Sequence, residues 1–378
     1  MEPIQSKIWL RSDKTILGNH QPTYLSQYSN INELLSNGRR NILVVAAHQD
    51  DEIIGMGGTI ALYSSGIDYA KDWQSQKLAD KSMRAFLNGG LGTYSEKTVS
   101  DLMQRLEESG RKLILPPNNP SNVIVVYVTN GAKTEQTVKN DLLHAHPEKT
   151  LEEILDRQET SNLQQITERL NQARYPETLA ALRYVGATTA IFLEYQSSQI
   201  GHDSYKPAKD LAEVIRMFKP ESIFTLSPFE FSHNSHILVS DLTVNAVRLV
   251  QDSDYNPSLK GYPVWDPDKL LHIEIVDISE VLKLKLDAIH LHSSFGSQGE
   301  YGRRYEDTGC LNQLHAVSLT AYDYFNASMQ RQPRLPANIM AVEIFTDMNP
   351  LLKDDNNMTL KGFVEEHFQE RLRKYPIN

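Results

Sequence analysis

Short apolar runs, each ended by polar residues, recur along this 378-residue chain. The first run, Asn41–Ala47 (NILVVAA), is rich in aliphatic and β-branched residues and gives way at once to polar ones. A run of this kind is typical of a strand that is buried in a parallel sheet. The same pattern predicts further strands at Val123–Thr129, Thr189–Leu193, Ser222–Leu226, Leu271–Val276 and Ile339–Phe345.

Segments with helical periodicity lie between these runs. In Pro207–Lys219, apolar residues at 211, 215 and 218 share one face, and Pro220 ends the helix. Similar patterns predict helices at Thr59–Ser65, Arg174–Tyr184, Ile237–Val250 and Val281–Leu291. Alternating strands and helices predict an α/β fold, a Rossmann-like, doubly wound, mostly parallel sheet with helices on both faces. In such a sheet, ligands bind at the carboxyl ends of the strands, near a switch in strand order.

Two stretches interrupt this alternation, and we interpret both as insertions. Residues 67–122 contain a glycine-rich segment and the breaker cluster PPNNP at 116–120. Residues 132–172 are polar and charged, and residues 1–40 read as an N-terminal extension. The sequence therefore predicts a single α/β domain over residues 1–378, with a core over residues 41–350 and insertions at 67–122 and 132–172.

Net charge, cysteine content and the lack of long apolar runs exclude several classes of function. The formal net charge of −10 argues against nucleic-acid binding by phosphate neutralisation. Cys310 is the only cysteine, so an intrachain disulfide framework and a CxxC metal site are both excluded. The first 20 residues lack the apolar core of a signal peptide, and no apolar run approaches the roughly 18 residues that cross a bilayer. We therefore expect a cytoplasmic protein without a membrane span or a nucleic-acid partner.

The polar residues directly after the first strand are candidates for chemistry. The segment Ala47–Glu52 (AHQDDE) places one imidazole and three carboxylates close together. Burying such groups beside an apolar strand is costly unless something compensates the charge. A divalent cation would do so, because carboxylate and imidazole are zinc ligands. The alternative is that these acidic residues meet the dipole of the following helix, but the neighbouring His48 favours the metal.

A second cluster follows the predicted strand Ser222–Leu226. It reads SPFEFSHNSH over residues 227–236, and His233 and His236 are spaced so that they can face one site. An HxxH pair alone is a weak signal, but this pair lies at the same sheet edge as His48. Two histidines and one carboxylate, with an open position for water, form the usual plan of a catalytic zinc site. Such an ion lowers the pKa of water and polarises a bound carbonyl.

Taken together, these motifs resemble the LmbE-like, or PIG-L, family of metal-dependent N-deacetylases. The family hallmark is AHPDDE before a glycine-rich helix start, and it is similar to Ala47–Glu52 followed by Gly55–Gly58. The segment His233–His236 resembles the family's HPDH-like motif. Weaker similarities lie in Arg174–Leu193 and Val276–Ser294, so motif order and rough spacing agree over residues 41–295 once the insertions are allowed.

The resemblance implies a zinc-dependent enzyme, with ferrous iron as the alternative ion, that hydrolyses the N-acetyl group of an amino-sugar-like small molecule. It implies His48, Asp51 and His236 as the metal ligands. It also implies Asp50 as the general base and His233, if protonated, as the group that stabilises the tetrahedral oxyanion. The resemblance does not fix the oligomeric state, and a homo-oligomer stays open.

Three positions depart from the family pattern. Gln49 stands in place of a proline, which we expect to alter the rigidity of the loop. Asn234 and Ser235 replace a Pro-Asp pair, which removes a carboxylate that could charge or orient a neighbouring histidine. Glu194 follows Leu193 where the family often has an aspartate near the substrate. The substrate specificity of the family therefore does not transfer directly.

Two other functions stay open at this point. A nucleotide-sugar-dependent transferase would use Asp50 and Asp51 to hold a cation and a diphosphate, but the histidines would then be unexplained. A non-catalytic protein that binds carbohydrate or another partner could keep the fold. Against that alternative, every residue of the implied metal and base set is present.

Overall fold

The structure is a computed structural model, and part of the chain is described. The described residues are 34, 36–65, 112–113, 120–131, 139, 143, 148–150, 153, 163–165, 167, 177–178, 181–182, 184–197, 200–201, 205–231, 233–252, 254–265, 273–292, 341–353 and 358–366. Most of the N-terminal extension and of the two predicted insertions lies outside these ranges, as does much of the predicted helix Arg174–Tyr184.

The described strands form a single eight-stranded sheet, in the order β2-β7-β8-β6-β5-β1-β3-β4. Parallel pairs join β1 to β3 and β5, β3 to β4, β5 to β6 and β2 to β7, whereas β8 is antiparallel to both β6 and β7. The prediction of a mostly parallel α/β sheet is confirmed. The strands are β1 (Asn41–Ala46), β2 (Lys112–Leu113), β3 (Asn122–Thr129), β4 (Thr189–Tyr195), β5 (Ser222–Leu226), β6 (Ser258–Tyr262), β7 (Ile273–Asp277) and β8 (Val342–Asp347).

Strand β1 lies near the centre of the sheet, between β3 and β5. Val44 pairs in register with Val125 on β3 and with Phe224 on β5, and all three side chains are fully buried. A strand buried on both faces needs this continuous apolar sequence. From β1 the chain order runs outward through β3 and β4 on one side and through β5 and β6 on the other. The switch in strand order therefore lies between β1 and β5, where α/β sheets bind ligands.

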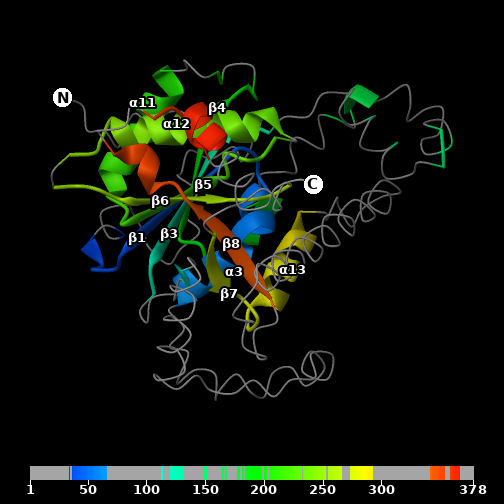
Figure 1. Ribbon diagram of the computed structural model, residues 1–378. Helices are drawn as coiled ribbons and strands as arrows, with labels where there is room; N and C mark the ends of the chain where they lie inside the picture. Colours follow the sequence, from blue (N-terminus) through cyan, green and yellow to red (C-terminus); the bar gives the residue numbers. More distant parts are fainter. Residues whose placement is uncertain are drawn as a thin grey trace, which may run out of the picture.

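Helices cover both faces of the sheet, which confirms the doubly wound prediction (Figure 1). Helix α3 (Asp51–Ser65) packs against α13 (Leu282–Leu291) on one face. Helices α11 (Tyr205–Phe218) and α12 (Asn234–Arg248) pack together on the other face. A short 3-10 helix, η3 (Asn349–Leu352), follows β8.

Helix α3 begins eight residues earlier than the predicted Thr59–Ser65, because the glycine-rich segment is itself helical, with a kink at Met56. The glycines allow close packing. A Cβ on Gly55 would lie 2.5 Å from Tyr262 Cδ2, and one on Gly58 would lie 2.7 Å from Ile278 Cγ2. These glycines therefore bring α3 against the end of β6 and the loop after β7.

A buried carboxylate on β8 stabilises α3 just after the kink. Glu343 accepts hydrogen bonds from the backbone amides of Gly58 and Thr59 at 3.0 and 2.7 Å, and from the Thr59 hydroxyl at 2.6 Å. Lys285 on α13 lies 2.7 Å from the same carboxylate, and both side chains are fully buried. A carboxylate suits the positive end of a helix segment, so this network joins α3, α13 and β8.

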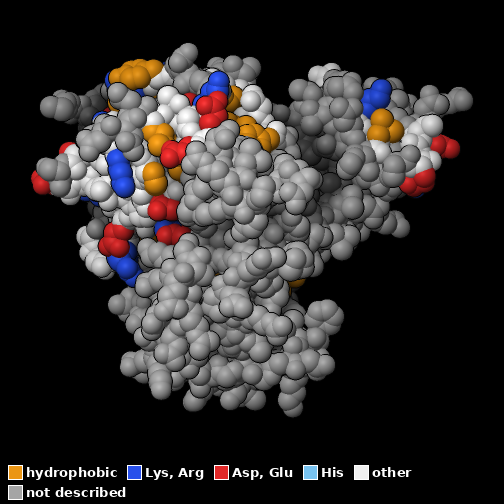
Figure 2. Space-filling model, viewed as in Figure 1, with side chains coloured by type: hydrophobic (Ala, Val, Ile, Leu, Met, Phe, Trp, Pro, Cys, Tyr) orange, Lys and Arg blue, Asp and Glu red, His pale blue; other side chains and the backbone are white. Residues whose placement is uncertain are grey.

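Within the described ranges, no helix is long and apolar enough to cross a membrane. On the face shown in Figure 2, acidic and basic side chains of the described residues are interspersed with hydrophobic ones.

Candidate metal centre

The candidate site lies at the carboxyl ends of β1 and β5, on the two sides of the switch in strand order. His48 follows β1, and Asp51 is the first residue of α3. His233 is the N-cap residue of α12, and its extended backbone (φ −137°, ψ 102°) precedes His236 in the first turn. Since β1 and β5 are adjacent and parallel, their following loops meet at one edge. The structure thus brings together two segments that are nearly two hundred residues apart.

Three imidazoles converge at this edge. His48, His233 and His236 each offer one ring nitrogen, and these atoms all lie within 4.8 Å of one another. The His233 and His236 rings stack with centroids 4.4 Å apart, and the His48 ring lies 5.0 Å from His233 and 5.4 Å from His236. Side chains spaced in this way could share one metal ion, so the arrangement allows His233 as a ligand in addition to the implied set.

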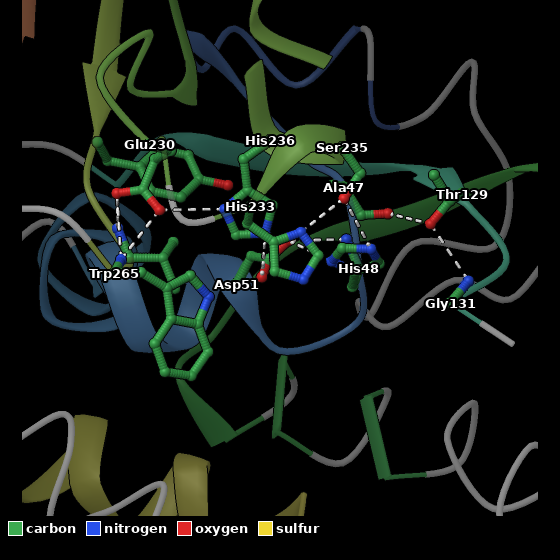
Figure 3. Close-up of polar contacts among 12 residues, drawn as sticks. Ala47, His48, Asp51, Thr129, Gly131, Glu230, His233, Ser235, His236 and Trp265 are labelled. Atoms are coloured by element: carbon green, nitrogen blue, oxygen red, sulfur yellow. Dashed lines mark hydrogen bonds and ion pairs between the residues drawn. The ribbon is translucent and has the colours of Figure 1, made fainter. Parts of the chain in front are cut away.

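Asp51 lies between two of these histidines. Its Oδ2 is 3.3 Å from His48 Nδ1, and its Oδ1 is 3.3 Å from His236 Nε2. Oδ2 also accepts a hydrogen bond of 2.8 Å from the backbone amide of His48, which fixes the carboxylate toward the histidines (Figure 3). Burial alone would raise the pKa of Asp51, but the charges of His236 and His48 outweigh it and hold this pKa well below its ordinary value. Asp51 is therefore a buried anion that needs a cation beside it.

His236 is fully buried and held by a second carboxylate. Its Nδ1 lies 3.1 Å from Glu230 Oε2. Burial would lower the pKa of His236, but Asp51 and Glu230 raise it to about 10. An ionised carboxylate only accepts hydrogen bonds, so Nδ1 keeps a proton whether or not Nε2 also carries one. The other nitrogen, Nε2, is buried without a hydrogen-bond partner.

These observations test whether the residues fit a metal ion. A ligating histidine usually donates its second ring N–H to a carboxylate, and this leaves the other nitrogen free for the ion. His236 has this arrangement, with Nε2 next to Asp51. The two carboxylates around it favour positive charge at this point. The donor set of imidazole and carboxylate suits zinc or iron, and the residues fit such an ion.

Glu230 is a residue of the candidate site that the sequence did not single out. It is fully buried after β5, and besides His236 it binds the backbone of the loop after β6. Its Oε1 accepts from the amides of Val264 at 2.8 Å and Trp265 at 3.1 Å, and its Oε2 accepts from Trp265 at 2.9 Å (Figure 3). The available signal was an acidic residue between two phenylalanines, three positions before His233.

His233 is exposed and lies next to a hydroxyl group. Its Nδ1 is 2.8 Å from Ser235 Oγ, and the same oxygen is 3.3 Å from His48 Nε2. Burial of part of the ring and the charges of His236 and His48 lower the pKa of His233 to about 4. The neutral ring is therefore favoured here, whereas the oxyanion role was expected for a protonated one. Ser235 occupies the position of the family's aspartate and supplies a hydroxyl in its place.

The two acidic neighbours of Asp51 have different surroundings. Asp50 is partly exposed, and its backbone carbonyl accepts from the amides of Ile53 and Ile54 at the start of α3. Glu52 is fully buried and accepts a 2.5 Å hydrogen bond from Tyr127 Oη on β3. Burial raises the pKa of Glu52 well above its ordinary value. Glu52 therefore faces the core beside β3, and Asp50 remains accessible.

The loops after β3 and β4 border the same edge. Gln49 Nε2 donates to the carbonyl of Asn130 at 3.0 Å, so the residue that replaces the family's proline connects the β1 loop to the β3 loop. Thr129 Oγ1 donates to the carbonyl of Ala47 at 2.6 Å. On β4, Glu194 has a φ of 57°, a left-handed conformation that is uncommon for a residue with a side chain. Arg174 lies outside the described residues.

The sequence model of one protein family, described as PIG-L, GlcNAc-PI de-N-acetylase, matches residues 117–247. The resemblance to the PIG-L family is confirmed. The matched region includes His233 and His236, whereas His48 and Asp51 precede it. No curated protein sequence matches the chain.

Several solved structures are similar to the chain. N,N'-diacetylchitobiose deacetylase from Pyrococcus horikoshii, complexed with an inhibitor, is 18% identical, with coverage of 85% of this chain and 88% of that chain and a TM-score of 0.47. The 4-carboxy-2-hydroxymuconate hydratase from Pseudomonas putida KT2440 is 18% identical, with coverage of 82% and 96% and a TM-score of 0.42. A deacetylase triple mutant of the teicoplanin biosynthetic pathway is 13% identical, with coverage of 84% and 100% and a TM-score of 0.42.

Proposed function

We propose that the chain is a zinc-dependent N-deacetylase that hydrolyses the acetamide of a sugar-like small molecule and releases acetate and an amine. Ferrous iron is the alternative ion. One observation carries the proposal. His236 Nε2 is buried without a hydrogen-bond partner, next to Asp51 and His48, while Glu230 holds its Nδ1. The match to the GlcNAc-PI de-N-acetylase family supports the reaction class.

In this proposal His48, Asp51 and His236 hold the ion. When bound, the ion lowers the pKa of water and polarises the amide carbonyl. Glu230 keeps the proton of His236 on Nδ1, so that Nε2 faces the site. A hydrogen bond from the His48 amide holds the Asp51 carboxylate toward the histidines.

Asp50 is the general base. It precedes Asp51 in the loop before α3 and is partly exposed, so it is accessible to a water at the site. It takes a proton from the attacking water and returns it to the leaving amine.

His233 stabilises the oxyanion of the tetrahedral intermediate by a hydrogen bond. If Ser235 Oγ donates to Nδ1, the ring proton lies on Nε2, which can donate toward the substrate. This role does not need a charged ring. The alternative, that His233 is a further ligand, follows from its proximity to the other two histidines.

We also propose that the chain forms one domain with a core over residues 41–350. All described strands, from β1 to β8, belong to one sheet, which supports this. The short strand β2 falls inside the predicted insertion 67–122 and pairs with β7, so that insertion adds an edge strand to the same sheet.

The test combines metal analysis with acetate release from a panel of N-acetyl amino sugars, for the wild type and three variants. His236→Ala should lose both the ion and activity. Asp50→Asn should keep the ion and lose activity by about two to four orders of magnitude, as expected for a general base. His233→Ala should keep the ion and lose about 10²–10³ in kcat.

Each contrary outcome has a distinct meaning. Loss of the ion in His233→Ala would make His233 a ligand. An ion without acetate release from any substrate would leave the site intact but contradict the reaction. Absence of bound metal under all conditions would contradict the hydrolase and favour the non-catalytic binding protein.

A further inference from the structure

A large exposed aromatic side chain stands beside the candidate metal centre. Trp265 follows β6 at the carboxyl edge of the sheet, and 40% of its surface is exposed. The three residues before it, 262–264, are buried. The chain therefore leaves the core at Trp265 and presents the indole at the sheet edge on which His48 and His236 lie.

The backbone of Trp265 is connected to the centre through one carboxylate. Glu230 Oε2 accepts from the Trp265 amide at 2.9 Å and lies 3.1 Å from His236 Nδ1. Glu230 Oε2 thus contacts both the Trp265 backbone and His236, which we propose as a metal ligand. Figure 3 shows the indole extending from this carboxylate on the side of Asp51 and His233. The backbone at the base of the indole is therefore held next to the centre.

Position distinguishes Trp265 from other exposed hydrophobic residues. Exposed hydrophobic side chains that stand singly are common and need no explanation. Tyr205 and Leu284 are of that kind, because they lie on α11 and α13, on the faces of the sheet. Trp265 and Phe231 instead both adjoin Glu230, one by hydrogen bonds and one in sequence, and they expose 40% and 43% of their surfaces. Of these two, Trp265 is connected to the polar centre by hydrogen bonds, and an apolar group beside a few polar ones is typical of small-molecule sites.

We propose that Trp265 is the stacking surface for the sugar-like ring of the substrate, with the acetamide directed toward the metal centre. This rests on the function proposed above. An indole offers a broad, flat apolar face. A sugar ring has a face of C–H groups with hydroxyls at its rim, so stacking removes apolar surface from water while the hydroxyls keep their hydrogen bonds. An acyclic amide lacks such a face, and Trp265 therefore selects for a ring.

The first experiment compares two amides in the metal-loaded full chain. Acetate release from N-acetylglucosamine and from the acyclic N-acetylethanolamine is measured for wild type, Trp265→Ala and Trp265→Phe. Trp265→Ala should raise KM for the sugar about tenfold, with kcat, zinc content and the acyclic reaction unchanged. Trp265→Phe should recover most of the loss. Tyr205→Ala, with an aromatic that is 66% exposed on α11, is the matched control and should behave as wild type.

Three results would contradict stacking of the sugar ring on Trp265. An unchanged KM for the sugar would overturn the proposal. Equal losses on both amides, or a lower zinc content, would also overturn it, because Trp265 would then support the centre as a whole. An effect that grows with the length of the acyl chain on a series of N-acyl glucosamines would assign the indole to the acyl group and refute stacking on the ring.

A second measurement separates this inference from the proposed function. Calorimetric binding of N-acetylglucosamine to metal-loaded Asp50→Asn needs no turnover, and adding Trp265→Ala should weaken it about tenfold. If the wild type releases no acetate but this loss of affinity is found, the reaction is wrong and the stacking surface stands. If the wild type is active but Trp265→Ala leaves the affinity unchanged, the stacking surface is wrong and the reaction stands.

Discussion

Replacing Glu230 with glutamine tests how the metal centre is held. Glutamine has nearly the same shape, but one of its two terminal atoms becomes an NH₂ donor. In the native side chain, Oε1 accepts from Val264 and Trp265, and Oε2 accepts from Trp265 and lies 3.1 Å from His236 Nδ1. In either orientation of the amide, its NH₂ group faces a second N–H donor, from the backbone or from His236, at a fully buried position.

The size of the loss in zinc affinity and stability depends on which N–H group loses its hydrogen-bond acceptor in Glu230→Gln. Turning the NH₂ group toward the Val264 and Trp265 amides breaks backbone contacts, and turning it toward His236 breaks the contact that fixes the imidazole. Loss of a carboxylate behind a ligating histidine typically lowers metal affinity by about 10–100-fold, or roughly 1.4–2.7 kcal/mol. An unsatisfied buried donor also costs about 1–3 kcal/mol of folding free energy. We expect both effects in Glu230→Gln.

Zinc affinity is measured by titrating metal-free protein in competition with a chelator, and stability by urea denaturation. Glu343→Gln is the matched control, because Glu343 is a fully buried carboxylate that also binds two backbone amides but contacts no histidine of the described ranges. The control should lose stability and keep its zinc affinity. Zinc affinity equal to wild type in Glu230→Gln, or an equal loss in both variants, would refute the specific role of Glu230.

Two further predictions concern the packing of α3. Lys285→Met should lower the free energy of unfolding by about 3–5 kcal/mol, because it leaves Glu343 buried without its cation; denaturant unfolding measures this, and full stability of the variant would contradict it. Gly58→Ala should cost about 1–3 kcal/mol, because the new Cβ would lie 2.7 Å from Ile278 Cγ2. Thermal unfolding of Gly58→Ala checks this, and a variant as stable as the wild type would contradict the clash.

The central strands could be predicted from sequence because their surroundings are uniform. The prediction for β5 agrees with the structure at both ends, and that for β1 is one residue too long. Such strands are covered by helices on both faces, so nearly every side chain must be apolar and the run stands out. The same rule placed β3, β4, β7 and β8 within a few residues.

Strand β6 was missed because its stability comes from distant partners. Its sequence, SLKGY, has no apolar run. Lys260 is buried against Glu274 on β7, and an ion pair of this kind leaves no local pattern. Gly261 lies so close to Met348 and Ser227 that a Cβ there would come within 2.9 Å of Met348 Sδ. The ion pair and the close packing of Gly261 both depend on residues distant in sequence, so a local hydrophobicity pattern does not reveal them.

The same limit applies to the site. His48 and the pair His233 and His236 could be placed near one another from sequence, because each follows a strand of a parallel sheet. Glu230 could not, because its partners include the backbone amides after β6, and that strand was itself missed. A local motif identifies side chains that are candidate ligands, whereas the groups that orient them depend on which loops the fold makes neighbours.

These neighbouring loops give the centre its rigidity. Gln49 joins the loop after β1 to the loop after β3, and Glu230 joins the loop after β5 to the loop after β6. The ends of four adjacent parallel strands are therefore joined in two pairs, β1 with β3 and β5 with β6, by side chains that are buried and hydrogen-bonded. If the function proposed above is correct, a site held in this way loses little conformational entropy when an ion or a substrate binds. At the position of the family's proline, Gln49 thus supplies a hydrogen bond between two loops.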